Sequence, residues 1–111
     1  MKIEIKKIKD VAILQISGSL DADSVPQFKK TALATVEGGC VKLVVNALRL
    51  EFIDSMGLGC LISLLRRVRT NKGDLKIAEL SPEVKQIFEI TRLHRLFDIF
   101  PTVEEAEQKF S

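Results

Sequence analysis

The segment from residue 52 to residue 59 holds the side chains best suited to chemistry in this chain. It reads FIDSMGLG, so that Asp54 and Ser55 stand side by side and glycines follow at 57 and 59. From Leu58 onward, apolar residues recur every three to four positions, which predicts a helix that begins here. We expect Ser55 at the N-cap of that helix. The free N–H groups of a helix start suit an anion.

Residue chemistry alone leaves four interpretations of this segment open. In the first, Ser55 caps the helix and Asp54 complements its dipole. In the second, the segment is a nucleotide phosphate loop, but Gly57 and Gly59 lack the third glycine of the GxGxxG pattern, where Ile62 stands. In the third, Ser55 is a nucleophile, although it lies outside a GxSxG frame and the chain has one histidine. In the fourth, Ser55 is phosphorylated, which would add about −1.5 to −2 units of charge.

The flanking sequence predicts the frame that positions this segment. The runs 3–8 and 11–17 are apolar and β-branched, and the Lys9-Asp10 turn between them predicts an antiparallel hairpin that breaks at Gly18. A first helix should begin near residue 23 with Asp23 or Ser24 as its cap. Strands are expected at 41–45, 75–78 and 97–100, and further helices after the capping residues Ser81 and Thr102.

This order, ββαβαβαβα, predicts a single α/β domain over residues 1–111. Its sheet should be mixed and four- to five-stranded, with helices packed on it. A short segment from Ala47 to Ile53, outside this count of strands, is expected to lead to Asp54 and Ser55.

Composition narrows the function classes. The length of 111 residues fits one domain. The 17 basic and 15 acidic side chains are spread evenly, unlike the one-sided basic surface of a nucleic-acid-binding protein. No apolar run approaches the ~20 residues of a membrane span. Cys40, Cys60 and His94 are too few for a zinc site, so we expect no metal. With the even charge distribution and the short apolar runs, we also expect no nucleic-acid or membrane partner. No cofactor is expected either.

The stretch from Val44 to Gly59, VVNALRLEFIDSMGLG, resembles the signature of the STAS domain. It is most similar to the bacterial anti-sigma factor antagonists of the sporulation and stress-response kind. The similarity covers essentially the whole chain: residues 18–21 resemble the family's turn before its first helix, 81–84 and 91–97 its third helix and the exit from it, and 103–106 its closing helix.

The resemblance implies a cytoplasmic, non-enzymatic switch. In that family the unphosphorylated antagonist binds an anti-sigma factor, itself a serine/threonine kinase, and so frees a sigma factor. The kinase phosphorylates the serine directly after the aspartate, binding is lost, and a PP2C-type phosphatase restores it. By this correspondence Ser55 is the phosphoacceptor.

The same correspondence implies a partner-binding surface around the phosphoacceptor. Asp54 would orient the site or contact the partner, and Asp21 would lie near the same surface. Met56 stands where relatives usually have a small residue and would extend an apolar contact. Gly57 and Gly59 are expected to let the backbone of the kinase approach.

Two other readings of the same residues are weighed against this one. A receiver-type phosphoaspartate domain would use Asp54, but the chain lacks the acidic pair and the late lysine that such domains need. A STAS scaffold that binds partners, a nucleotide or another small ligand without phosphorylation stays open, because Ser55 would cap the helix in either case.

Overall fold

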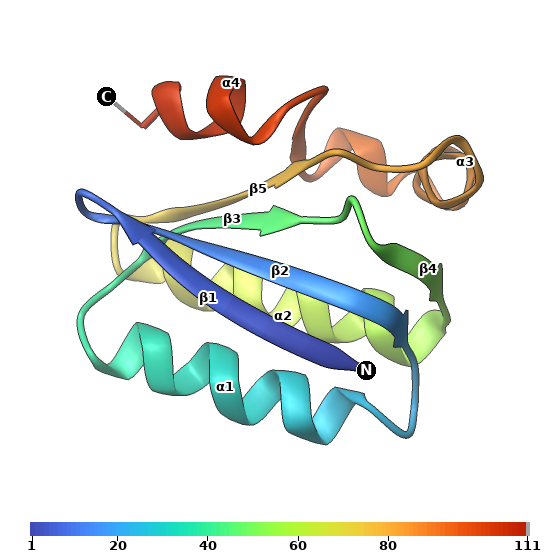
Figure 1. Ribbon diagram of the computed structural model, residues 1–111, viewed down its shortest axis with the longest axis horizontal. Coiled ribbons are helices and arrows are strands. Elements are labelled where there is room, and N and C mark those ends of the chain that lie inside the picture. Colours follow the sequence, from blue (N-terminus) through green and yellow to red (C-terminus); the bar gives the residue numbers. More distant parts are fainter. Residues whose placement is uncertain (111) are drawn as a thin grey trace.

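The computed structural model describes residues 1–110, which form one sheet with helices on both of its faces (Figure 1). Along the chain, the elements are β1 (Lys2–Ile8), β2 (Val11–Leu20), α1 (Val25–Glu37), β3 (Lys42–Asn46), β4 (Leu50–Ile53), α2 (Ser55–Thr70), β5 (Asp74–Ala78), α3 (Pro82–Ile90), the 3-10 turn η1 (Leu93–Arg95), β6 (Asp98–Phe100) and α4 (Val103–Gln108).

The sheet is mixed, which confirms the predicted fold class. Its strands lie in the order β1-β2-β3-β5-β6, and β4 pairs separately with β2. The β1–β2 hairpin is antiparallel, and all other pairings are parallel. Parallel neighbours require crossovers: α1 connects β2 to β3, α2 lies between β3 and β5, and α3 lies between β5 and β6.

The sheet has six strands, one more than the highest number predicted, because 50–53 is a strand and not a connection. The expected break at Gly18 is also wrong, since β2 continues to Leu20. Gly18 has a φ of +92°, and the register of β2 shifts between Gly18 and Ser19. This irregularity re-aims the last residues of β2, and β4 pairs with them.

The two faces of the sheet carry two separate hydrophobic cores, and alternate residues of β2 belong to one or the other. Ala12, Leu14 and Ile16 are fully buried in the larger core, which α1, α2 and α3 cover. The alternate residues Val11 and Ile13 belong to a smaller core with Ala106 of α4. Figure 1 shows α1 and α2 side by side below the sheet and α4 above it. The alternation follows from the two-residue period of a strand.

The predicted caps of α3 and α4 are confirmed, and at α1 the predicted position is confirmed but the capping bond is not. The Ser81 hydroxyl accepts a hydrogen bond from the Val84 N–H, and the Thr102 hydroxyl accepts one from the Glu105 N–H. At α1, Ser24 occupies the N-cap position, but its side chain makes no capping bond. Its hydroxyl accepts instead from the Asp21 N–H and donates to the Ser19 carbonyl oxygen.

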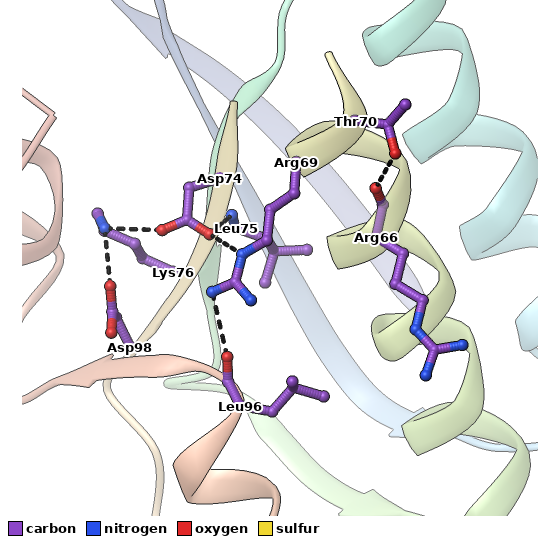
Figure 2. A network of polar contacts seen from close by, with 8 residues as sticks. All are labelled: Arg66, Arg69, Thr70, Asp74, Leu75, Lys76, Leu96 and Asp98. Carbon is purple, nitrogen blue, oxygen red and sulfur yellow. Dashed lines mark hydrogen bonds and ion pairs between the residues drawn. The ribbon is translucent and has the colours of Figure 1, made fainter. Parts of the chain in front are cut away.

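A polar network ties the end of α2 to the sheet (Figure 2). Asp74 of β5 accepts from Arg69 Nε of α2 and from Lys76 Nζ, at 3.1 Å each. Arg69 also donates to the Leu96 carbonyl oxygen, and Lys76 to Asp98 of β6 at 3.1 Å. Burial raises the pKa of Asp74, but hydrogen bonds from Lys76, the Leu75 N–H and Arg69 outweigh it and leave that pKa below its ordinary value.

Candidate functional site

The start of α2 is organised by Asp54, and the expectation that Ser55 is the N-cap is wrong by one residue. Asp54 has an extended backbone at the N-cap, and its Oδ1 accepts a hydrogen bond of 2.8 Å from the Gly57 N–H. Both residue types are good caps, so sequence alone does not separate two adjacent ones. With Asp54 as the cap, Ser55 is the first residue of the helix, and capping does not account for it.

Asp54 also joins the start of α2 to the loop between β2 and α1. Its Oδ2 accepts a hydrogen bond of 3.0 Å from the Ala22 N–H, and its own N–H donates to the Leu20 carbonyl oxygen. The structure therefore brings Asp21, the neighbour of Ala22, to the same end of the molecule as Ser55.

Asp21 itself shapes that loop. Its Oδ1 accepts hydrogen bonds of 3.1 Å from the N–H groups of Asp23 and Ser24. This side-chain turn competes with ordinary helix capping, which explains why Ser24 does not cap α1. Asp21 and Asp54 are both half-buried, and each already holds backbone N–H groups of the chain.

Ser55 and its neighbour present an exposed surface of mixed polarity. Ser55 is exposed, and within residues 1–110 its hydroxyl takes part in no side-chain hydrogen bond. The side chain of Met56 is also exposed, as is that of Phe52 at the end of β4 (57% and 49%). Phe52 was not among the residues predicted from the sequence to lie at the site. The feature that could have indicated it is an aromatic residue three positions before Ser55.

The two glycines after Ser55 have different surroundings. Gly57 is buried, and a Cβ there would collide with the Leu20 carbonyl oxygen and lie 2.8 Å from Cγ1 of Ile53. The expected reason for Gly57, room for a partner's backbone, is therefore wrong: the close approach is made by the chain's own β2. A Cβ at Gly59 would meet nothing within 4 Å, so this exposed position is open to a partner.

The remaining reactive side chains described in residues 1–110 include Cys60 and His94. Burial raises the pKa of the Cys60 thiol, against a smaller lowering by Lys29, so its thiolate is disfavoured. His94 is exposed, and its Nδ1 lies 3.3 Å from the Phe88 carbonyl oxygen. Among residues 1–110, no group of three or more ligating side chains could hold a metal ion. None of the helices described there has the length and apolar character of a membrane span.

The fold and the site define a small α/β domain in which a mixed sheet carries an exposed serine at the start of a helix, next to the capping residue Asp54. The model of the STAS domain family matches residues 2–106. The chain therefore belongs to the STAS domain family.

Two curated proteins are similar to this chain over most of its length. The protein BtrV of Bordetella bronchiseptica is 28% identical over 110 residues, which are 99% of this chain and 95% of BtrV. The anti-sigma-B factor antagonist of Staphylococcus aureus is 28% identical over 86 residues, which are 78% of this chain and 80% of that protein.

A solved structure confirms the fold independently. The anti-sigma factor antagonist SpoIIAA in its unphosphorylated form superposes with a TM-score of 0.74 at 21% identity, covering 97% of this chain and 96% of SpoIIAA. The chain therefore has the fold of SpoIIAA, and the curated relatives of this STAS domain are named as anti-sigma factor antagonists, which are regulatory binding proteins and not enzymes.

Proposed function

We propose that this chain antagonises its anti-sigma factor under the control of a phosphate on Ser55. In the cytoplasm, the unphosphorylated chain binds an anti-sigma factor with serine/threonine kinase activity and so releases a sigma factor. Phosphorylation by that kinase ends the complex, and a PP2C-type phosphatase restores the binding form. Asp21, Asp54, Met56 and Gly59 form the surrounding contact region, and the buried Gly57 supports it by letting α2 pack closely on β2.

The observation that carries this proposal is the position of Ser55. It is exposed at the first residue of α2, while the work of capping is done by Asp54. A phosphate can therefore be added without breaking a bond of the fold. The solved structure of the Bacillus protein SpoIIAA in a phosphorylated form, at 21% identity and a TM-score of 0.76, supports the idea that this fold tolerates a phosphate.

Electrostatics explains why a phosphate would release the partner. The added charge of about −2 would lie beside the carboxylate of Asp54 and the apolar side chain of Met56. Enclosing it in a packed interface costs several kcal/mol unless a cation pairs with it. Because about 1.4 kcal/mol corresponds to a factor of ten in affinity, the complex should weaken by orders of magnitude.

The test uses a candidate kinase encoded beside this chain's gene. With labelled ATP, wild type should incorporate phosphate and Ser55→Ala should not. Ser63→Ala is the matched control, since Ser63 is exposed two turns further along the same helix. In titration calorimetry, Ser55→Asp should bind the anti-sigma factor about 100-fold more weakly or worse, and Ser55→Ala should keep full affinity.

Two results would contradict the proposal. Labelling of Ser55→Ala as strong as that of wild type would place the phosphate elsewhere. An anti-sigma factor complex that survives stoichiometric phosphorylation of Ser55 would favour the alternative, a STAS scaffold or ligand-binding module that acts without a phosphate switch.

A further inference from the structure

A groove lies between the two helices that cover the larger core. It has a volume of about 570 Å³, and its walls come from α1 between Val25 and Leu33 and from α2 between Ser55 and Arg67. The two helices run side by side in the same direction in Figure 1, so the groove follows both. Its volume falls within the range of about 300–1,000 Å³ that is typical of small-molecule sites.

Small residues on α2 keep the groove open. Ser55, Gly59 and Ser63 all line it and are spaced four residues apart, which places them along one face of the helix. The Cβ position of Gly59 meets nothing within 4 Å, so a larger side chain there would point into free space. Beneath this face, Phe28 of α1 and Leu64 of α2 are buried and supply an apolar floor.

The charges of the groove have one sign. Lys29 and Arg67 are the charged residues of its lining, which includes no acidic side chain. Both are exposed, and in the part of the chain described, residues 1–110, neither forms an ion pair. An apolar groove with two unpaired cations is complementary to a ligand that has an apolar body and an anionic group.

We propose that this groove binds a single-chain aliphatic carboxylate, a fatty acid. The alkyl chain lies against Val25, Phe28, Leu64 and Met56, and the positive charges of Lys29 and Arg67 in the lining attract the carboxylate. The proposal goes beyond the phosphorylation switch and does not depend on it. By helix geometry the groove extends about 18 Å from Ser55 to Arg67, which suits an extended chain.

The charges argue against a second copy of this chain as the occupant. If two grooves met face to face, Lys29 and Arg67 of one copy would approach the same cations of the other, and no acidic side chain of the lining would pair with them. Like charges across an interface disfavour association.

The experiment titrates dodecanoate, below its micelle concentration, into the full chain in a calorimeter. Dodecyltrimethylammonium serves as the matched cationic amphiphile. We expect dodecanoate to bind one to one and the cation to bind at least about tenfold more weakly. A second readout is the half-buried thiol of Cys60, which lines the groove. Saturating dodecanoate should slow its reaction with a thiol reagent, measured in a Cys40→Ala background.

Variants assign the binding to this groove. The double variant Lys29→Gln/Arg67→Gln should bind dodecanoate at least about tenfold more weakly. The matched control is Lys30→Gln/Arg66→Gln, which removes the adjacent exposed cations outside the groove and should bind like wild type. Gly59→Leu, which fills the open position, should abolish binding and the protection of Cys60.

Several results would overturn the proposal. These are the absence of dodecanoate binding to wild type, equal affinity for the cationic amphiphile, and unchanged affinity in Gly59→Leu. If wild type binds no dodecanoate while Gly59→Leu loses the anti-sigma factor, the groove belongs to a protein partner and the fatty acid proposal fails. Loss of the phosphate switch alone would leave the proposal standing.

Discussion

At the scale of single residues, Gly57 and Gly59 show how one sequence motif combines two requirements. Gly57 allows the first turn of α2 to lie against the Leu20 carbonyl oxygen, and the same turn is capped by Asp54. The exposed Ser55 is thus held on a helix start that the backbone of β2 and the Asp54 cap keep in place. At Gly59 a Cβ would meet nothing within 4 Å outside the surrounding turns of the helix, so this glycine contributes open space.

This difference predicts opposite effects of the same substitution. Gly57→Ala should lower the free energy of unfolding by about 1–3 kcal/mol, because its Cβ overpacks against the backbone of β2. Gly59→Ala should leave it unchanged or raise it by up to about 1 kcal/mol, since alanine is the better helix former and the space is free. Urea denaturation of the two variants and wild type measures both values. Equal destabilisation by the two alanines would contradict the packing described for Gly57.

At the scale of elements, the network around Asp74 couples the end of α2 to β5 and β6. Asp74 binds Arg69 on the helix and Lys76 on its own strand, and Lys76 reaches Asp98 on β6. Lys76 is buried, so two carboxylates and the rings of Phe100 and Phe110 take the place of water around its ammonium group. This pairing fixes the end of α2 opposite to Ser55.

The lowered pKa of Asp74 gives this network a pH dependence. The folded state binds the proton of Asp74 less readily than the unfolded state, whose ordinary pKa is 3.8. The stabilisation from Asp74 is therefore fully present above that value and is lost as the pH falls through the lower pKa of the folded state. Urea unfolding between pH 7 and about pH 2 should show wild type more stable than Asp74→Asn at pH 7, with the difference shrinking in acid.

Asp10 provides the control for this pH effect. The hydrogen bond from Lys42 lowers the pKa of Asp10 as well, but Asp10 is fully exposed to solvent. Solvent screens such a pair, so Asp10→Asn should change the stability little at any pH. A difference between wild type and Asp74→Asn that stays constant from neutral pH to strong acid would show that Asp74 is not held in its charged form by the fold.

The order of the helices and strands could largely be predicted from the sequence. The strand that was missed, β4, depends on non-local pairing. Strong local signals, such as Ser81 before Pro82 and the alternation of β2, identified elements correctly because the energies involved are local. Strand β4 was missed because its inner residues Glu51 and Phe52 are both exposed, so it lacks alternation. Its pairing depends on the bulge in β2, a non-local effect. At the start of α2 the helix itself was predicted, but its cap was misplaced by one position, from Asp54 to Ser55.

At the scale of the whole molecule, the two faces of the sheet are unequally protected. The larger core is covered by α1, α2 and α3, whereas the smaller core beneath α4 contains few residues. Helix α4 is short, and Glu79, the residue directly after β5, holds its start by accepting a hydrogen bond of 3.1 Å from the Val103 N–H. The start of α2, which carries Ser55, lies on the opposite side of the sheet from α4 (Figure 1).

A charge introduced beneath α4 should therefore destabilise the whole chain. Ala106 is fully buried in the smaller core, and Ala106→Asp would place a carboxylate there without a partner. We expect a loss of about 3 kcal/mol or more in the free energy of unfolding, because a buried unpaired charge is among the most costly single changes. The matched variant Ala34→Asp, on an exposed position of α1, should lose less than about 1 kcal/mol. If urea unfolding gave both variants the same stability, α4 would not be packed against the sheet in solution, and the smaller core would contribute nothing to the fold.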